Sequence, residues 1–170
     1  MPRNVEVKAR LDDLESFKKL AESISDTKAE IIHQHDTFFK TDGEYRLKLR
    51  KQSGQNRLIS YKRSDKEGPK LSQYAHYWTD NPDSLREVLS QAYSLRGTVE
   101  KKRTLYMSGQ TRIHVDEVKD LGHFMELEVC LRDDQSLEEG ELIGKNLMQQ
   151  LHVKQSNLVC GAYIDFLEKN

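Results

Sequence analysis

This 170-residue sequence has few cysteines, no long apolar run and no apolar segment at its N-terminus. Its two cysteines, Cys130 and Cys160, show no metal-binding spacing, which argues against a cysteine-based metal site. The lack of an N-terminal apolar run argues against secretion, and no stretch approaches the roughly 20 apolar residues of a membrane span. We therefore expect a cytoplasmic protein with free or buried thiols and no membrane partner.

An excess of charge of one sign is also missing. Lysine and arginine total 27, and aspartate and glutamate total 28. Binding to nucleic acid through net charge requires a basic surplus, so we expect no nucleic-acid partner. If the protein binds an anion, its basic groups have to be concentrated in one place and matched by acidic groups elsewhere.

No internal repeat, low-complexity tract or Pro/Gly-rich linker divides the chain, so residues 1–170 are expected to fold as a single domain, either monomeric or homodimeric. Apolar residues at helical spacing predict a helix soon after the first strand, with Asp12 and Glu15 in a capping box. Three more helices are expected, over 81–93, 137–151 and 161–167.

Strand-like segments dominate the rest of the sequence. The expected strands are 3–11, 30–40, 45–51, 56–63, 71–79, 98–107, 110–118 and 123–132. A sheet of this many antiparallel strands in one domain closes most readily, because closure removes unpaired edges. The predicted fold class is therefore α+β, a closed eight-stranded antiparallel β-barrel with helices packed on the outside.

Several of these strands carry an apolar face and a charged face. In the first, Val5 and Val7 share one side while Glu6 and Lys8 share the other, because side chains alternate along a strand. The charged residues that fall in phase on later strands are Arg46, Lys48, Arg50, Lys62, Lys101, Arg103, Arg112, Asp116, Glu126 and Glu128. A solvated surface with cross-strand ion pairs is one explanation of this pattern. We favour a charged interior, because the amphipathic helices can cover the apolar faces from outside.

A charged interior has to be hydrated and balanced, because burying each unpaired ion costs several kcal/mol. Lysines and arginines around such a tunnel suit a polyphosphate chain. The Glu-x-Glu pair, Glu126 and Glu128, suits a hard divalent cation such as Mg²⁺ or Mn²⁺. Together the two signs indicate metal-assisted attack on a triphosphate-containing small molecule.

The order of these motifs resembles that of the CYTH superfamily of triphosphate tunnel metalloenzymes, over about residues 5–167. The segments that carry the resemblance are NVEVK, LKLR, SYK, VEKKRTLY, HVDEVKDLGHFMELEV and AYIDFL. It implies one CYTH-like tunnel domain over residues 1–170. It also implies substrate-binding residues Lys8, Lys48, Arg50, Lys62, Lys101 and Arg103, metal ligands Glu6, Asp116, Glu126 and Glu128, and catalytic residues Lys62, Glu6 and Lys8.

Two segments depart from the family pattern. Asn4 stands where the family usually has its first glutamate, so one metal ligand is neutral here. Tyr74, His76 and Trp78 occupy a strand where many relatives carry glutamate and arginine. We interpret Trp78 and the tyrosines as packing groups, and we expect His76 and His114 either to face the tunnel or to be structural.

Three functions are compatible with this sequence. The first is metal-dependent hydrolysis of inorganic tripolyphosphate or of an organic or nucleoside triphosphate. The second is a class IV-type adenylyl cyclase, which converts ATP to cyclic AMP and pyrophosphate and needs an adenine pocket that no residue identifies. The third is a triphosphate-binding module that has lost turnover, for which Asn4 and the altered fifth strand are the evidence.

Overall fold

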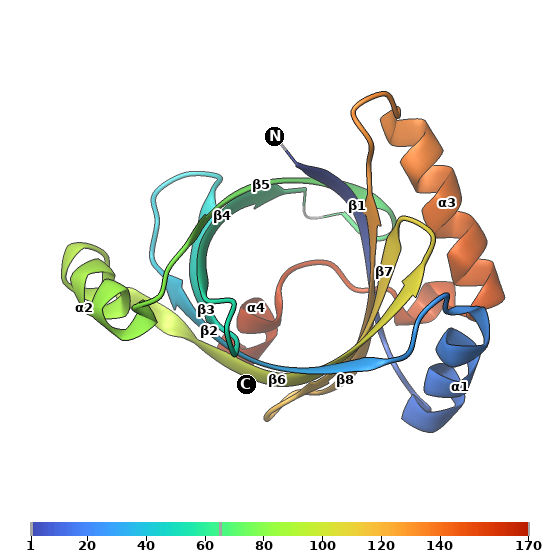
Figure 1. Ribbon diagram of the computed structural model, residues 1–170, viewed down its shortest axis with the longest axis horizontal. Coiled ribbons are helices and arrows are strands. Elements are labelled where there is room, and N and C mark those ends of the chain that lie inside the picture. The colour runs from blue at the N-terminus through green and yellow to red at the C-terminus, as the bar shows by residue number, and fades with distance from the viewer. Residues whose placement is uncertain (1, 65, 170) are drawn as a thin grey trace.

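A closed antiparallel β-barrel forms the body of the computed structural model, which describes residues 2–64 and 66–169 (Figure 1). The order of strands around the barrel is β1-β5-β4-β3-β2-β6-β7-β8. The strands are β1 (Arg3–Arg10), β2 (Glu30–Phe39), β3 (Arg46–Lys51), β4 (Arg57–Arg63), β5 (Lys70–Trp78), β6 (Leu95–Ser108), β7 (Thr111–Val118) and β8 (Gly122–Cys130). The predicted fold class is confirmed, and β6 is longer than the sequence indicated.

The helices lie on different sides of the barrel. They are α1 (Leu14–Ile24), α2 (Pro82–Ala92), α3 (Leu137–Gln150) and α4 (Tyr163–Glu168). In Figure 1, α1 and α3 lie together beside β1, β7 and β8, whereas α2 lies on the opposite side. The N-cap of α1 is Asp13 and not Asp12, since Asp13 Oδ1 accepts a hydrogen bond from Ser16 N at 3.0 Å. No helix in the described ranges is long and apolar enough to cross a bilayer.

The main hydrophobic core lies outside the barrel wall, between the sheet and the helices α1 and α3. Val7, Ile113 and Leu127 on the outer face of the sheet are fully buried there, against Phe17 of α1 and Leu147 of α3. Because the apolar face of these strands points outward to the helices, the alternate side chains have to point into the lumen. This arrangement is what places charged residues inside the barrel.

Gly140 lets α3 approach β1 closely. A Cβ atom at this position would lie 2.5 Å from Leu131 Cδ2 and 2.7 Å from Val5 Cγ2. One turn later, a Cβ atom at Gly144 would meet only ordinary contacts, the nearest being 3.7 Å from Val7 Cγ2. Packing therefore requires glycine at position 140 but not at position 144.

We expect Gly140→Ala to lower the free energy of unfolding by about 1–3 kcal/mol, because overpacking against Val5 and Leu131 outweighs the gain in helix propensity. Gly144→Ala is the matched control and should be neutral or slightly stabilising. Urea denaturation of both variants measures the difference. Equal stability of the two variants would show that α3 moves away from the sheet without cost.

The short helix α4 closes one end of the barrel. Tyr163 and Ile164 are buried together with Phe38, Val99 and Phe124, which come from the inner faces of three strands. Ion pairs with the barrel strands hold this helix. Arg46 Nη1 lies 2.9 Å from Asp165 Oδ2, and Arg96 Nε lies 2.7 Å from Glu168 Oε1. Figure 1 shows α4 lying within the outline of the barrel. The opposite end remains open, where Trp78 at the end of β5 is 49% exposed.

Candidate active site

The barrel encloses a tunnel of about 590 Å³, a volume typical of small-molecule sites. All eight strands and α4 contribute to its wall. Of the site residues predicted from the sequence, eight line this tunnel: Glu6, Lys8, Lys48, Arg50, Lys101, Arg103, Glu126 and Glu128. Asp116 is fully buried on the inner face of β7, where Arg103 and Tyr163 cover it, and Lys62 lies outside the barrel.

A basic cluster, Lys48, Arg50 and Lys101, surrounds the carboxylate of Asp36 on β2. Arg50 donates two hydrogen bonds of 2.8 Å to Asp36, and Lys101 Nζ donates one of 3.3 Å. Lys48 Nζ lies 3.7 Å from the same carboxylate. Burial alone would raise the pKa of Asp36, but the three positive charges hold it well below the usual range. One negative charge is therefore shared by three cations.

The lysines of this cluster ionise less readily than lysines in water. Burial lowers the pKa of Lys101 to about 8, with Asp36 opposing the shift and the charges of Arg50 and Arg103 adding to it. Burial and the neighbouring Arg50 likewise hold the pKa of Lys48 well below its normal value. A group of cations with too little negative charge nearby favours binding of a multivalent anion.

Arg103 on β6 is positioned by a second buried carboxylate. Its Nε and Nη2 atoms donate to the two oxygens of Asp116 at 2.7 and 2.8 Å, and the Tyr163 hydroxyl donates to Asp116 Oδ2 at 2.7 Å. Burial would raise the pKa of Asp116, but the charge and hydrogen bonds of Arg103 hold it at about 2. Both oxygens of this predicted metal ligand are thus engaged in orienting Arg103 and Tyr163.

An acidic cluster, Glu6, Glu126 and Glu128, occupies the wall formed by β1 and β8. Glu6 faces Glu128 directly across the two strands, and His114 on β7 faces Glu126. Ligand atoms of His114, Glu126 and Glu128 all lie within 4.8 Å of one another. Burial and the negative charges of Glu126 and Glu6 raise the pKa of Glu128 to about 7. A cation bound among these carboxylates would relieve that repulsion.

The acidic cluster and the neighbouring His114 together offer donor atoms that fit a divalent metal ion. His114 is 3% exposed, and its Nδ1 atom is buried with no hydrogen-bond partner in the described residues. Burial and the charge of Arg103 hold the pKa of His114 well below normal, so the ring is neutral and able to act as a ligand. Carboxylate oxygens suit Mg²⁺ and Mn²⁺ alike, and an imidazole nitrogen favours Mn²⁺ of the two. The sequence did not single out His114 as a ligand.

Lys8 lies between the acidic cluster and the closed end of the tunnel. Its Nζ atom is 3.7 Å from Glu126 Oε2, donates a hydrogen bond of 3.2 Å to the carbonyl of Gly161, and lies 4.2 Å from the ring centre of Tyr163. Arg103 Nη2 is 4.0 Å from the same glutamate oxygen. Positive and negative groups therefore meet at Glu126.

Lys62 does not join the other predicted site residues. Its side chain is 43% exposed and forms an ion pair with Glu44 outside the tunnel. Its neighbours in β4, Ile59 and Tyr61, are the side chains that line the lumen, so the expected inward phase of this strand is wrong by one residue. The centre of the Tyr61 ring lies 5.1 Å from Lys48 Nζ, so Tyr61 points into the lumen beside this lysine.

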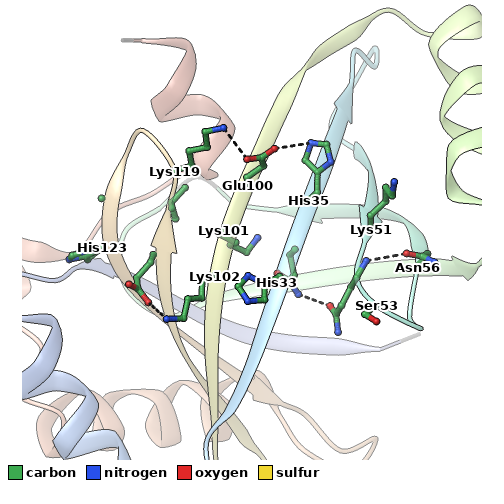
Figure 2. Close-up of a pocket in the computed structure, with 15 residues that line it drawn as sticks. His33, His35, Lys51, Ser53, Asn56, Glu100, Lys101, Lys102, Lys119 and His123 are labelled. Atoms are coloured by element: carbon green, nitrogen blue, oxygen red, sulfur yellow. Dashed lines mark hydrogen bonds and ion pairs between the residues drawn. The ribbon is translucent and has the colours of Figure 1, made fainter.

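A second hollow, of about 680 Å³, is drawn in Figure 2. It is lined by side chains of β2 and β6 and by the turns that follow β3 and β7, among them His33, His35 and Lys102. Figure 2 shows Glu100 between Lys119 and His35. Its Oε2 atom lies 3.2 Å from Lys119 Nζ, and its Oε1 atom lies 3.9 Å from His35 Nε2. Because these exposed charges already pair with one another, this hollow offers no concentrated charge to a ligand, and the tunnel is the candidate active site.

A closed barrel with clusters of both signs in its lumen is the architecture of a triphosphate tunnel. The family model described as CYTH domain matches residues 2–163, and the chain therefore belongs to the CYTH family, whose members include triphosphatases and adenylyl cyclase-like enzymes. The resemblance noted in the sequence is confirmed.

Individual relatives and solved structures are similar to this chain at low sequence identity. A protein of Methanocaldococcus jannaschii named "Putative adenylate cyclase" is 24% identical, and the alignment covers 95% of this chain and 96% of that protein. The structure of the PH1012 protein of Pyrococcus horikoshii has a TM-score of 0.84 at 23% identity, covering 95% and 98% of the two chains. The Hippeastrum protein HpAC1, described with a dominant triphosphatase activity, has a TM-score of 0.69 at 15% identity over 98% and 95%.

Proposed function

We propose that this protein is a divalent-metal-dependent triphosphatase that hydrolyses a triphosphate inside its barrel. The observation that carries the proposal is the convergence of two clusters of opposite sign on one tunnel. Four cations, Lys48, Arg50, Lys101 and Arg103, line it together with the acidic cluster and His114. The first set suits phosphate oxygens and the second suits a metal ion.

The basic residues hold the substrate in this scheme. Arg50 and Arg103 are fixed by bidentate hydrogen bonds to Asp36 and Asp116, so their outer faces are oriented before the substrate arrives. Lys48 and Lys101 supply point charges to the phosphate chain. Binding a polyanion keeps both lysines protonated, which offsets the effect of burial on their pKa values.

The acidic cluster holds the metal. Glu6, Glu126, Glu128 and His114 are the proposed ligands, and a bound Mg²⁺ or Mn²⁺ would neutralise phosphate charge and lower the pKa of an attacking water. Lys8 places a positive charge beside Glu126, where the two clusters meet. We assign Lys8 to the charge that develops on the phosphoryl group during transfer.

Phosphate release from tripolyphosphate and ATP in Mg²⁺ or Mn²⁺ tests this function. We expect Lys101→Gln to lower kcat/KM by about 100-fold or more, because it removes a buried cation from the phosphate site. Lys62→Gln is the matched control, and we expect it to retain activity within about twofold, since the Lys62 side chain lies outside the tunnel. Equal losses in both variants would contradict the proposed site.

A class IV-type adenylyl cyclase is the second candidate. It is favoured by the name of the Methanocaldococcus jannaschii relative and requires the same metal and basic residues. The same incubation with ATP separates the candidates, because cyclisation yields cyclic AMP and pyrophosphate whereas hydrolysis yields free phosphate. Tight binding of ATP with neither product would identify a binding module instead.

A further inference from the structure

Three aromatic rings, Tyr74, His76 and Trp78, form a row on the inner face of β5. Their ring centres are 5.9 Å apart for Tyr74 and His76 and 5.2 Å apart for His76 and Trp78, and all three line the tunnel. From the sequence alone, we interpret Trp78 and the tyrosines as packing groups. Instead Trp78 is 49% exposed, so core packing does not explain its inward position.

The aromatic row extends from the acidic cluster to the open end of the tunnel. Tyr74 is partly buried, and it lies between Lys70, which pairs with Glu6 of the acidic cluster across β1 and β5, and the end of β5 at Trp78. His76 and Trp78 are exposed, in the order in which β5 reaches the rim. A ligand that leaves the charged clusters toward the open end therefore passes these rings.

Arg57 stands beside the last ring of the row. It pairs with Trp78 across β4 and β5, and its guanidinium carbon lies 5.1 Å from the Trp78 ring centre. This contact holds the indole at the rim while about half of its surface stays accessible. An accessible indole with a fixed cation beside it is a stacking surface for a flat ring that carries phosphates.

We propose that the aromatic row binds a nucleobase by stacking, so that the substrate is a nucleoside triphosphate and not inorganic tripolyphosphate. This inference rests on the proposed function, since the triphosphate has to lie between the charged clusters for its base to reach Trp78. The packed residues around α4 close the other end, so the organic group has to extend toward the rim. Stacking tolerates every base, so purines and pyrimidines should both bind.

The strand offers a matched control in Tyr77. This residue is next to Trp78 in the sequence, but its side chain is on the outer face of β5 and is 68% exposed. Removing either aromatic ring affects a half-exposed or exposed side chain near the same strand end. Only the loss of Trp78 changes the tunnel.

Calorimetric binding in Mg²⁺ tests the inference, with methylene-bridged analogues of ATP, CTP and tripolyphosphate that resist hydrolysis. We expect Trp78→Ala to weaken binding of both nucleotide analogues about tenfold and to leave the tripolyphosphate analogue unchanged. Trp78→Phe should retain most of the affinity, and Tyr77→Ala should change nothing. Trp78 is the single tryptophan of the chain, so its fluorescence should respond to the nucleotide analogues and not to the tripolyphosphate analogue.

Nucleotide affinity that is unchanged in Trp78→Ala would overturn the inference while leaving the proposed function intact. An equal loss for the nucleotide and tripolyphosphate analogues would also overturn it, because the tryptophan would then support the phosphate site and not a base. Failure of the wild-type protein to bind any of the three analogues would overturn the proposed function, and the inference with it.

Discussion

Glu128→Gln is expected to lower metal affinity at least 100-fold and to abolish most turnover, because it removes a charged ligand from the acidic cluster. The same substitution should stabilise the metal-free protein at about pH 8 by about 1–3 kcal/mol. The pKa of Glu128 is raised to about 7 in the folded protein. Its charge therefore destabilises the fold progressively as pH rises from the unfolded-state pKa to about 7, and the glutamine removes that cost.

Metal titration and thermal unfolding of the metal-free protein measure the two effects. In the wild type, apparent metal affinity should fall about tenfold per pH unit below about pH 7, since a proton on Glu128 competes with the metal. The variant should lose this dependence near neutral pH. Glu100→Gln, on the outer face of β6, is the matched control and should change neither property. A variant that keeps wild-type metal affinity would remove Glu128 from the metal site.

Asp36→Asn is expected to destabilise the protein by about 3–5 kcal/mol, because it leaves Lys48, Arg50 and Lys101 buried without their shared counter-charge. It should also bind tripolyphosphate in the absence of metal at least tenfold more tightly, since the anion then takes the place of the lost carboxylate. Added tripolyphosphate should therefore raise the unfolding temperature of the variant more than that of the wild type.

Thermal unfolding with and without tripolyphosphate tests this expectation. Asp134→Asn provides the same chemical change at an exposed ion pair, where Asp134 is 3.5 Å from Arg132, and it should shift stability by less than about 1 kcal/mol. If the anion raises the unfolding temperature of the Asp36 variant and of the wild type equally, then Asp36 does not compete with the phosphate chain.

The barrel and most of the charged lumen could be predicted from the sequence because both follow from a period of two. On β1 and β8 the apolar set packs against α1 and α3, so the alternate set, including Glu6 and Glu126, has to point inward. The helices are amphipathic and pack their apolar faces on the sheet, so the apolar face of these strands is the outer one. Where a helix covers the strand, alternation decides which face is inside.

The same reasoning fails on β4, where Lys62 points outward. Figure 1 shows α1 and α3 on the other side of the barrel, and α2 packs on β2 and β3, so the outer face of β4 meets solvent and accepts polar side chains. Ile59 and Tyr61 then line the tunnel although they are the apolar set. Periodicity separates two faces, but it does not say which of them is covered.

Asp36 and His114 were missed for a different reason. Asp36 receives its partners from β3 and β6, and a single acidic residue within a strand gives no sign of them in the sequence. His114 becomes a candidate ligand only through its register opposite Glu126. Cross-strand pairing joins residues far apart in the chain, and sequence spacing carries no information about it.

The packed helix α4 makes the passage a dead end. Tyr163, Ile164 and Phe124 fill that end of the lumen. Under the proposed function, a phosphate chain would enter only by its terminus, and its products would leave by the route of entry. A longer polyphosphate could then be shortened only stepwise from a free terminus, never cut in the middle, and the departing phosphate would have to pass whatever group still occupies the rim.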